Sequence, residues 1–213
     1  MIVDERTVTF INSMDVGNTV ELNKIEEYAL ENFVPIIKQE TQSLIKTLLA
    51  IKRPMSILEV GTAIGFSTLF MSEYAPGGCK ITTIENYEKR IPIALKNINE
   101  AGKSDSITLI EGDANEVLKE LDGKFDFIFM DAAKGQYINF LPHVMRLLDG
   151  NGILITDNVL QDGDIIESKY AVTRRNRTIH SRMREYLYEL KHNKELETTI
   201  IAIGDGVSIS VKK

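Results

Sequence analysis

Short apolar runs alternate with amphipathic segments over most of the chain between residues 55 and 158. The runs read SILEV, KITTIE, SITLIEG, FDFIFMD and GILITDN. Each has the length of a buried strand, and the segments between them have the apolar spacing of helices. This alternation is the βαβ rhythm of a parallel sheet that helices cover on both faces. The pattern therefore predicts an α/β fold.

Other patterns flank this core. Two helical patterns precede it, over residues 20–33 and 37–51, and Pro35 separates them. After the fifth strand, a polar and basic stretch ends in a further helical pattern, which two apolar runs follow, ETTIIAIG and GVSISVKK. The Gly204-Asp205-Gly206 turn between these runs predicts a hairpin, so one strand is expected to be antiparallel at or near an edge of the sheet.

The composition is that of one well-packed domain. The chain has 213 residues, of which 43% are hydrophobic and 26% are charged, so we expect a single domain over residues 1–213. One cysteine, Cys79, excludes an intramolecular disulfide framework and a zinc site built from cysteines. The first residues carry acids where a signal peptide would carry bases, and no apolar run approaches the ~18 residues that span a bilayer. We therefore expect a cytoplasmic protein without a membrane partner.

Charge is distributed unevenly along the chain. The net charge of −6 argues against a general attraction to nucleic acid. Residues 169–192, however, hold seven Lys or Arg and two Glu, so this segment is +5 and the remainder is −11. We refer to residues 169–192 as the basic window.

A glycine-containing loop follows the first predicted strand, in the sequence ILEVGTAIGFS. Gly61 and Gly65 let the backbone turn tightly and approach a ligand, and Ser67 offers a hydroxyl near the start of the next helix. Ligands of open α/β sheets bind beyond the carboxyl ends of the strands. This loop is therefore the first candidate for ligand binding.

Two later strand ends complete a pocket for a nucleoside. Glu85 ends the second strand, where it can accept hydrogen bonds from ribose hydroxyls, and Asp113 and Ala114 follow the third, beside a base. A dinucleotide and S-adenosylmethionine are the two cofactors to consider. The dinucleotide fingerprint G-x-G-x-x-G is replaced here by G-T-A-I-G, with Thr62 and Ala63 where its spacing fails, and this favours S-adenosylmethionine.

Acidic and amide side chains end the fourth and fifth strands. Asp131 follows the fourth, and Asp157 and Asn158 follow the fifth. If those strands are neighbours, three oxygen ligands meet at one edge of the pocket, a set that suits a hard cation such as Mg²⁺. Each acid alone could be a helix cap or a solvated residue, but together beside a cofactor loop they favour a metal site. Lys134 near such a cation could serve as a base near neutral pH, because the cation disfavours its ammonium form.

The motifs GTAIGFS, TIE, GDA, MDAAKGQY and ITDN, in this order, resemble the metal-dependent O-methyltransferases of the catechol and caffeoyl-CoA type over nearly the whole chain. The resemblance implies a Rossmann-like methyltransferase fold, with a seven-stranded, mostly parallel sheet whose last strand is antiparallel, and with extra N-terminal helices. It implies that Mg²⁺ or Mn²⁺ binds Asp131, Asp157 and Asn158. It also implies that Asp131 and Lys134 are catalytic. The contacts with S-adenosylmethionine that it implies are Ser67, Glu85, Asp113 and Asp131, with Ile37 where the N-terminal helices close over the cofactor. Gly61 and Ala114 are cofactor contacts that the loop and the strand ends predict.

The acceptor is expected to present two neighbouring oxygens to the metal. Catechols do so, and so does 5-hydroxyuridine, in which the C5 hydroxyl adjoins the C4 carbonyl. Five arginines of the basic window could follow RNA phosphates, or this segment could be an amphipathic helix whose polar face is basic. These arginines are Arg174, Arg175, Arg177, Arg182 and Arg184.

Within this family, DAAKGQY with DNVL, the arginine-rich segment and IGDGVSIS are most similar to the bacterial tRNA 5-hydroxyuridine methyltransferases, which form 5-methoxyuridine at the wobble position. The plant enzymes typically continue as DNTLW, where this chain has Val159, Leu160 and Gln161. The resemblance thus implies tRNA as the partner, and a homodimer. Two alternatives stay open, a methyltransferase of small catechol-like phenols and a nucleotide-binding module without catalysis.

Overall fold

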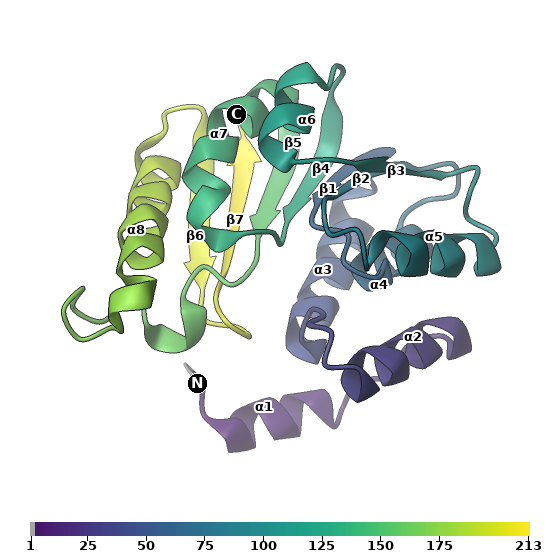
Figure 1. Ribbon diagram of the computed structural model, residues 1–213, viewed down its shortest axis with the longest axis horizontal. Helices are drawn as coiled ribbons and strands as arrows, with labels where there is room; N and C mark the ends of the chain where they lie inside the picture. Colours follow the sequence, from purple (N-terminus) through teal and green to yellow (C-terminus); the bar gives the residue numbers. More distant parts are fainter. Residues whose placement is uncertain (1–2) are drawn as a thin grey trace.

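The computed structural model describes residues 3–213; Met1 and Ile2, which begin the predicted domain, lie outside the described part. Its strands are β1 (Ser56–Val60), β2 (Lys80–Glu85), β3 (Ile107–Glu111), β4 (Phe125–Met130), β5 (Leu148–Thr156), β6 (Leu196–Ile201) and β7 (Val207–Lys212). They form one sheet in the order β3-β2-β1-β4-β5-β7-β6 (Figure 1). Neighbours from β3 to β5 are parallel, and β7 is antiparallel to both β5 and β6. The predicted seven-stranded sheet with an antiparallel last strand is confirmed.

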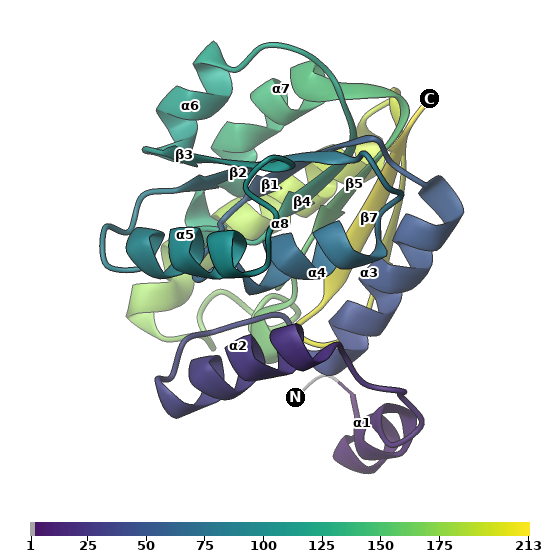
Figure 2. The ribbon, with the colours of Figure 1, turned by 90° about the vertical axis from the view of Figure 1, so that its right-hand side faces the viewer.

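Helices cover both faces of the sheet. They are α1 (Glu5–Asn12), α2 (Val20–Glu31), α3 (Gln39–Lys52), α4 (Phe66–Tyr74), α5 (Ile91–Glu100), α6 (Ala114–Glu120), α7 (Tyr137–Leu147) and α8 (Arg177–His192). Short 3-10 turns are η1 (Lys134–Gln136), η2 (Gln161–Gly163) and η3 (Arg174–Asn176). Figure 2 shows the sheet between α6 and α7 on one side and α3, α4 and α5 on the other. Among residues 3–213, no helix has the length and apolar character needed to cross a membrane.

Alternating side chains of the central strands form two hydrophobic cores, because successive residues of a strand point to opposite faces. In β1, Leu58 and Val60 pack with α6, α7 and α8, whereas Ile57 packs with α3, α4 and α5. In β4, Ile128 packs with α6, α7 and α8, whereas Phe127 packs with α3, α4 and α5. All of these side chains are fully buried. The two cores fix the sheet between its helices and thereby fix the strand ends.

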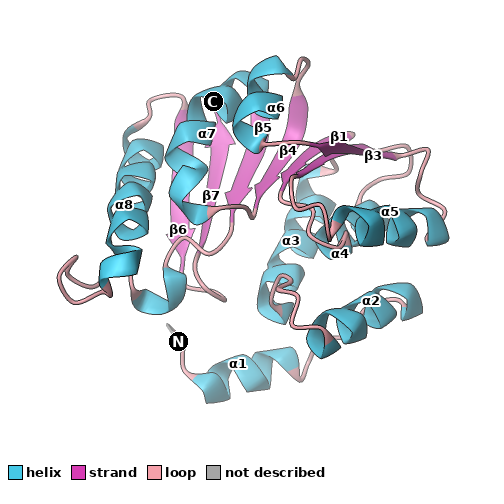
Figure 3. Ribbon diagram, viewed as in Figure 1, coloured by secondary structure: helices cyan, strands magenta, loops and turns pink. Residues whose placement is uncertain are grey.

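The N-terminal helices agree only in part with the sequence pattern. α2 and α3 correspond to the two predicted helices, with slightly different ends. The pattern did not predict α1, a helix of eight residues in which every residue is at least partly exposed. Asp4 caps α1 by accepting a hydrogen bond from the amide of Thr7 at 3.2 Å. Figure 3 places α1 and α2 away from the strands.

Hydrogen bonds between strands continue past the strand ends and set the positions of the next residues. The amide of Asp131 donates to the carbonyl of Val60, and the amide of Asp157 donates to that of Met130, both at 3.0 Å. Gly61 extends β1 in the same way, toward β2. The residues that follow these parallel strands therefore lie side by side at one edge of the sheet.

Candidate active site

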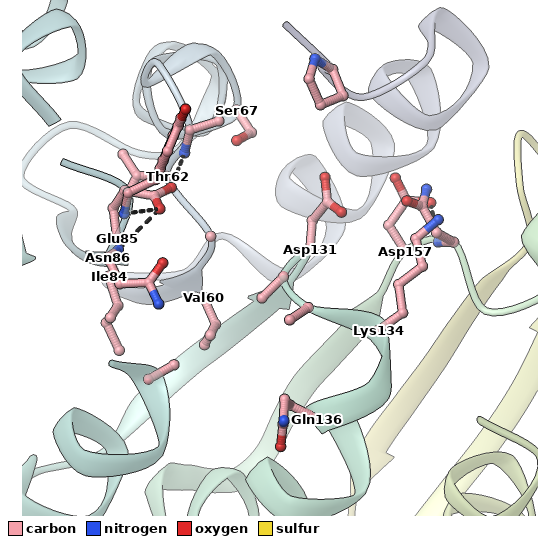
Figure 4. Close-up of a pocket in the computed structure, with 18 of the residues that line it drawn as sticks. Val60, Thr62, Ser67, Ile84, Glu85, Asn86, Asp131, Lys134, Gln136 and Asp157 are labelled. Atoms are coloured by element: carbon pink, nitrogen blue, oxygen red, sulfur yellow. Dashed lines mark hydrogen bonds between the residues drawn. The ribbon is translucent and has the colours of Figure 1, made fainter. Parts of the chain in front are cut away.

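A cavity of about 690 Å³ lies at the carboxyl ends of the parallel strands (Figure 4). Every residue that the sequence predicted for the cofactor, the metal or the base lines it. These residues are Ile37, Gly61, Ser67, Glu85, Asp113, Ala114, Asp131, Lys134, Asp157 and Asn158. The structure therefore brings all ten together in one place.

One end of the cavity, the nucleoside end, is built around Glu85, which lies beside Thr62 and Asn86 in Figure 4. Its Oε2 accepts a hydrogen bond from the amide of Ala63 at 2.7 Å. Its Oε1 accepts from the amides of Asn86 and Tyr87, both at 2.9 Å. These bonds fix the carboxylate and leave it able to accept one more hydrogen bond, from a ligand hydroxyl.

Asp113 has a structural role at the same end. As the N-cap of α6, its Oδ1 accepts hydrogen bonds from the amide of Asn115 at 2.8 Å and from the side-chain amide of Asn115 at 3.0 Å. Ala114 follows it in the cavity wall, and the buried Ile37 reaches the cavity from the segment before α3. The contacts of these residues with a cofactor stay predictions.

A buried carboxylate that the sequence reasoning missed supports the glycine loop. Glu59, within SILEV, is fully buried. Its carboxylate accepts hydrogen bonds from the hydroxyls of Ser67 at 2.5 Å, Thr83 at 2.6 Å and Thr68. Burial raises the pKa of Glu59 to about 7, although the three hydrogen bonds oppose this shift. Ser67 therefore directs its hydrogen to Glu59, and only its oxygen lone pairs remain for a ligand. A charged residue within an apolar strand was the signal that could have revealed Glu59.

The other end of the cavity, the acceptor end, contains Asp131, Lys134 and Asp157, which Figure 4 labels, together with Asn158. Burial raises the pKa of Asp157 to about 7, and the charge of Asp131 adds to this shift. Burial likewise raises the pKa of Asp131, and the Lys134 ammonium opposes it. The side chain of Lys134 extends toward Asp157. The charged form of both carboxylates is therefore disfavoured, although only Asp157 is a buried residue and Asp131 is partly exposed.

The donor set of the acceptor end fits a hard divalent cation. Two carboxylates and one amide supply oxygen ligands, and a cation between them would offset the repulsion of the aspartates. Asn158 adopts a φ of 60°, and its main-chain amide donates to Oδ1 of Asp157 at 2.7 Å. Within residues 3–213, no group of three or more His, Cys, Asp or Glu side chains is placed to hold a metal. The candidate metal site therefore depends on the amide oxygen of Asn158.

An ion pair that the sequence did not predict closes the acceptor end. Lys38, which directly precedes α3, has its Nζ 2.6 Å from Oδ1 of Asp205 and 4.0 Å from Oδ1 of Asp162. Both Lys38 and Asp205 line the cavity. Burial would lower the pKa of Lys38, but the hydrogen bond and charge of Asp205 outweigh burial and raise it. Burial would raise the pKa of Asp205, but the hydrogen bond from Lys38 keeps it below its ordinary value.

The turn around Asp205 also supports the loop that follows Asn158. The amide of Val159 donates to the carbonyl of Gly206, and the amide of Leu160 donates to that of Asp205, both at 2.9 Å. A Cβ at Gly206, whose φ is 87°, would lie 2.4 Å from Cγ of Leu160. Only glycine fits this close contact. The predicted hairpin turn therefore contributes directly to the acceptor end.

A buried tyrosine links the backbones beside the two aspartates. The hydroxyl of Tyr137 accepts a hydrogen bond from the amide of Ala132 at 3.2 Å, and its own hydrogen can be donated to the carbonyl of Ala132 at 3.3 Å or to that of Asp157 at 3.4 Å. Its ring packs against Tyr186 of α8, with ring centroids 5.6 Å apart. Tyr186 in turn shares a 2.6 Å hydrogen bond with Thr156. Helices α7 and α8 thus support the backbone around both aspartates.

The arginines that the sequence predicted for RNA are not part of the cavity wall within residues 3–213. Arg174 and Arg175 are exposed in η3, immediately before α8. The guanidinium of Arg177 lies 5.8 Å from the ring centroid of Tyr170, within reach of a cation–π contact. Arg174 and Arg175 are therefore surface side chains outside the cavity wall, whereas Arg177 is half-buried.

The other two arginines donate hydrogen bonds to main-chain carbonyls. Nη1 of Arg182 donates to Gly135 at 3.0 Å, and Nη1 of Arg184 donates to Ile165 at 3.1 Å. Both side chains are nevertheless exposed. Their contact with RNA stays a prediction, and each already has a partner within the protein.

Sequence comparisons link this chain to a known family. Residues 13–213 match the O-methyltransferase family. The chain is 30% identical to caffeoyl-CoA O-methyltransferase 1 from Eucalyptus globulus, over 89% of this chain and 79% of that protein. It is 34% identical to a catechol O-methyltransferase from Niastella koreensis, over 53% of this chain and 52% of that protein.

Solved structures show the same architecture. A Staphylococcus aureus protein, described provisionally as a caffeoyl-CoA O-methyltransferase, superposes with a TM-score of 0.90 at 32% identity, over 99% of this chain and 100% of that one. The SAH-bound methyltransferase PaMTH1 from Podospora anserina has a TM-score of 0.88 at 25% identity, over 98% and 94% of the two chains.

The chain belongs to the O-methyltransferase family. It is an S-adenosylmethionine-dependent O-methyltransferase of the caffeoyl-CoA and catechol type, with the Rossmann-like methyltransferase fold. This result favours an enzyme over a nucleotide-binding module without catalysis.

Proposed function

We propose that this methyltransferase converts 5-hydroxyuridine to 5-methoxyuridine at the wobble position of tRNA, with S-adenosylmethionine and Mg²⁺ or Mn²⁺. The observation that carries the proposal is the cavity with two chemically different ends. A nucleoside end with a fixed Glu85 carboxylate adjoins an acceptor end with two acids, an amide and a lysine. The acceptor end suits a substrate with two neighbouring oxygens, which the C5 hydroxyl and C4 carbonyl of 5-hydroxyuridine provide.

The residues of the acceptor end have separate tasks in this reaction. Asp131, Asp157 and Asn158 would hold the divalent cation, which when bound lowers the pKa of an adjacent hydroxyl and orients its oxygen. Lys134, whose side chain extends toward Asp157, would act as the neutral amine, the form that a bound cation nearby favours, and would take the proton of the acceptor hydroxyl at Nζ. The acceptor oxygen then attacks the methyl carbon of the sulfonium, the C–S bond breaks, and S-adenosylhomocysteine leaves.

The basic window supports a nucleic acid as the substrate. Arg174 and Arg175 are exposed in η3, which leads directly into α8. An anticodon loop could place its wobble base in the cavity while these guanidinium groups bind phosphates outside, because arginine binds phosphate oxygens strongly. An enzyme that modifies a base needs this separation between base and backbone contacts.

Methylation of small catechol-like phenols is the second candidate function. The similarity to a protein named catechol O-methyltransferase favours it, and catechols present the same pair of neighbouring oxygens. In that case the basic window is a solvated helix face, and its arginines do not contribute to substrate binding.

We also propose that the protein is a homodimer and acts in the cytoplasm, where its proposed tRNA substrate is. Large apolar side chains are exposed on and beside α1 and α2: Phe10 is 64% exposed, Leu30 69% and Phe33 94%. A second copy that covers these side chains would remove apolar surface from water. Analytical ultracentrifugation tests this part of the proposal, and a monomer at micromolar concentration would contradict it.

A competition assay tests the proposed substrate. The purified protein receives labelled S-adenosylmethionine and Mg²⁺, together with tRNA that carries 5-hydroxyuridine and a catechol. Mass spectrometry of nucleosides and small molecules identifies the products. Formation of 5-methoxyuridine that a chelator abolishes would support both the substrate and the metal. Methylated catechol as the sole product would refute the tRNA substrate and favour the second candidate.

A further inference from the structure

Arg182 of α8 contacts the loop that carries Lys134. Its Nη1 donates a hydrogen bond to the carbonyl oxygen of Gly135 at 3.0 Å, although 47 positions separate the two residues in the sequence. Gly135 directly follows Lys134 within the short turn η1. We call residues 132–136 the Lys134 loop. The side chain that the sequence predicted as a phosphate contact therefore supports the main chain beside the proposed base.

The surroundings of the Lys134 loop show what this contact adds. At the start of the loop, the amide of Ala132 donates to the buried hydroxyl of Tyr137 at 3.2 Å. At its centre, α8 is so close that a Cβ at Gly135 would lie 3.7 Å from Cγ1 of Ile179. Tyr137 thus holds one end of the loop, α8 packs against its middle, and Arg182 adds a directional hydrogen bond at that point.

The position of the Lys134 loop matters for the chemical step. A lone 3-10 turn has few internal hydrogen bonds, so contacts with other elements decide where its main chain lies. Lys134 must reach the acceptor hydroxyl within hydrogen-bond distance to take its proton. Displacement of a catalytic group by about 1 Å can lower a rate by about a hundredfold. Loss of a contact that fixes this loop should therefore lower kcat and leave KM for the substrate nearly unchanged.

We propose that Arg182 is a positioning residue, whose hydrogen bond to Gly135 holds the Lys134 loop in the geometry that methyl transfer requires. This inference rests on the proposed role of Lys134 as the base. A guanidinium has several N–H donors, and the contact with Gly135 uses Nη1. The remaining donors of this exposed side chain can still bind a phosphate. Phosphate binding and positioning are compatible, but only positioning predicts an effect on an acceptor that has no phosphate.

Catechol as the acceptor separates these two roles. We would measure kcat and KM for Arg182→Ala, for Arg182→Lys, and for Lys194→Ala, which removes one charge from an exposed site just beyond α8. Arg182→Ala should lower kcat about tenfold with little change in KM. Arg182→Lys, which can still donate to Gly135, should recover much of that loss. Lys194→Ala should stay within about twofold of the wild type.

Hydrogen–deuterium exchange provides a second readout that needs no activity. Arg182→Ala should speed exchange in a peptide that covers residues 131–137 and leave β1 to β3 unchanged, whereas Lys194→Ala should change neither. The proposal is overturned if Arg182→Ala keeps the wild-type kcat for catechol and the wild-type exchange of this peptide. It is also overturned if exchange rises throughout the protein, because the effect would then be a general loss of stability.

Failure of the proposed function would look different. The wild type would then leave 5-hydroxyuridine in tRNA unmethylated, and the catechol kinetics would still judge the role of Arg182. If the wild type methylated neither acceptor, the proposed function would fail as a whole, and unchanged exchange in Arg182→Ala would overturn the positioning contact independently.

Discussion

Gly61 lies so close to Asp131 that a Cβ on Gly61 would be 2.0 Å from the carbonyl oxygen of Asp131. Gly61 also has a φ of 107°, a conformation that residues with a side chain rarely adopt. The first glycine of the nucleoside end therefore touches the backbone of the acceptor end. A side chain at position 61 would therefore displace the glycine loop of the nucleoside end and the Asp131 backbone of the acceptor end.

Gly61→Ala is expected to destabilise the protein by about 2 kcal/mol or more, because it combines backbone strain with a steric clash. It should also weaken the binding of S-adenosylhomocysteine. Urea denaturation and isothermal titration calorimetry measure these effects. Gly77→Ala is the control, since a Cβ there meets no atom within 4 Å among the described residues. A Gly61→Ala variant as stable as Gly77→Ala would contradict the close contact.

The buried Glu59 should make stability depend on pH. Its pKa is about 7 in the folded protein and 4.5 as the ordinary value. At pH values between 4.5 and about 7, the Glu59 carboxyl group keeps its proton in the folded chain and releases it in the unfolded chain. The unfolding free energy therefore falls as pH rises through this range. The contribution of Glu59 is complete below pH 4.5 and is lost as pH rises through about 7. It amounts to roughly 3 kcal/mol.

Glu59→Gln removes this dependence, because an amide does not titrate in this range. The stability of Glu59→Gln relative to the wild type should therefore increase between about pH 5 and pH 8 by up to roughly 3 kcal/mol. Urea denaturation at several pH values measures the difference. Glu88→Gln, at an exposed position, serves as the control. Its unfolding free energy relative to the wild type should not change with pH. A flat curve for Glu59→Gln as well would mean that Glu59 is ionised in the folded protein at pH 5.

The acceptor end should bind a divalent cation in the absence of substrate. Mg²⁺ in excess is expected to raise the melting temperature by about 2–4 °C, because the ion binds the folded state. Asp157→Asn should remove most of this increase, while Asp105→Asn, at an exposed position, should retain it. Differential scanning calorimetry with and without EDTA measures the effect. An equal increase in both variants would place the ion elsewhere.

Loss of Lys134 should slow methyl transfer without loss of the cofactor. Lys134→Ala is expected to lower kcat by about 10²–10⁴-fold, the usual contribution of a general base. The affinity for S-adenosylhomocysteine should stay within about twofold of the wild type. Rates measured across the pH range with the preferred acceptor, and calorimetry of the binary complex, test both statements. Lys96→Ala, on the exposed face of α5, controls for the lost charge. Full activity of Lys134→Ala at every pH would refute its role as base.

Strand order explains why most of the candidate site could be predicted from the sequence. Glu85 ends a strand, and Gly61, Asp131 and Asp157 each follow one. Parallel strands end at the same edge of a sheet. The position of each of these residues at or just after the end of a strand was therefore enough to predict that they line one cavity.

Contacts between distant segments could not be predicted in this way. The carboxylate of Glu59 is satisfied by hydroxyls from α4 and β2, whose approach depends on tertiary packing. Lys38 and Asp205 are 167 positions apart in the sequence. Arg182 meets Gly135 through a main-chain carbonyl, a group that every residue has, so the identity of the partner residue carries no signal.

The place of β7 between β5 and β6 has a consequence for the order in which the two ends of the cavity can form. The strands and loops of the nucleoside end have all been synthesised once translation has passed Ala114, long before it reaches β7. The acceptor end needs Asp205 and Gly206, which directly precede the last strand, to support Val159 and Leu160. Contacts of such large sequence separation form slowly. A nascent chain can therefore possess the elements of its cofactor pocket well before it can transfer a methyl group.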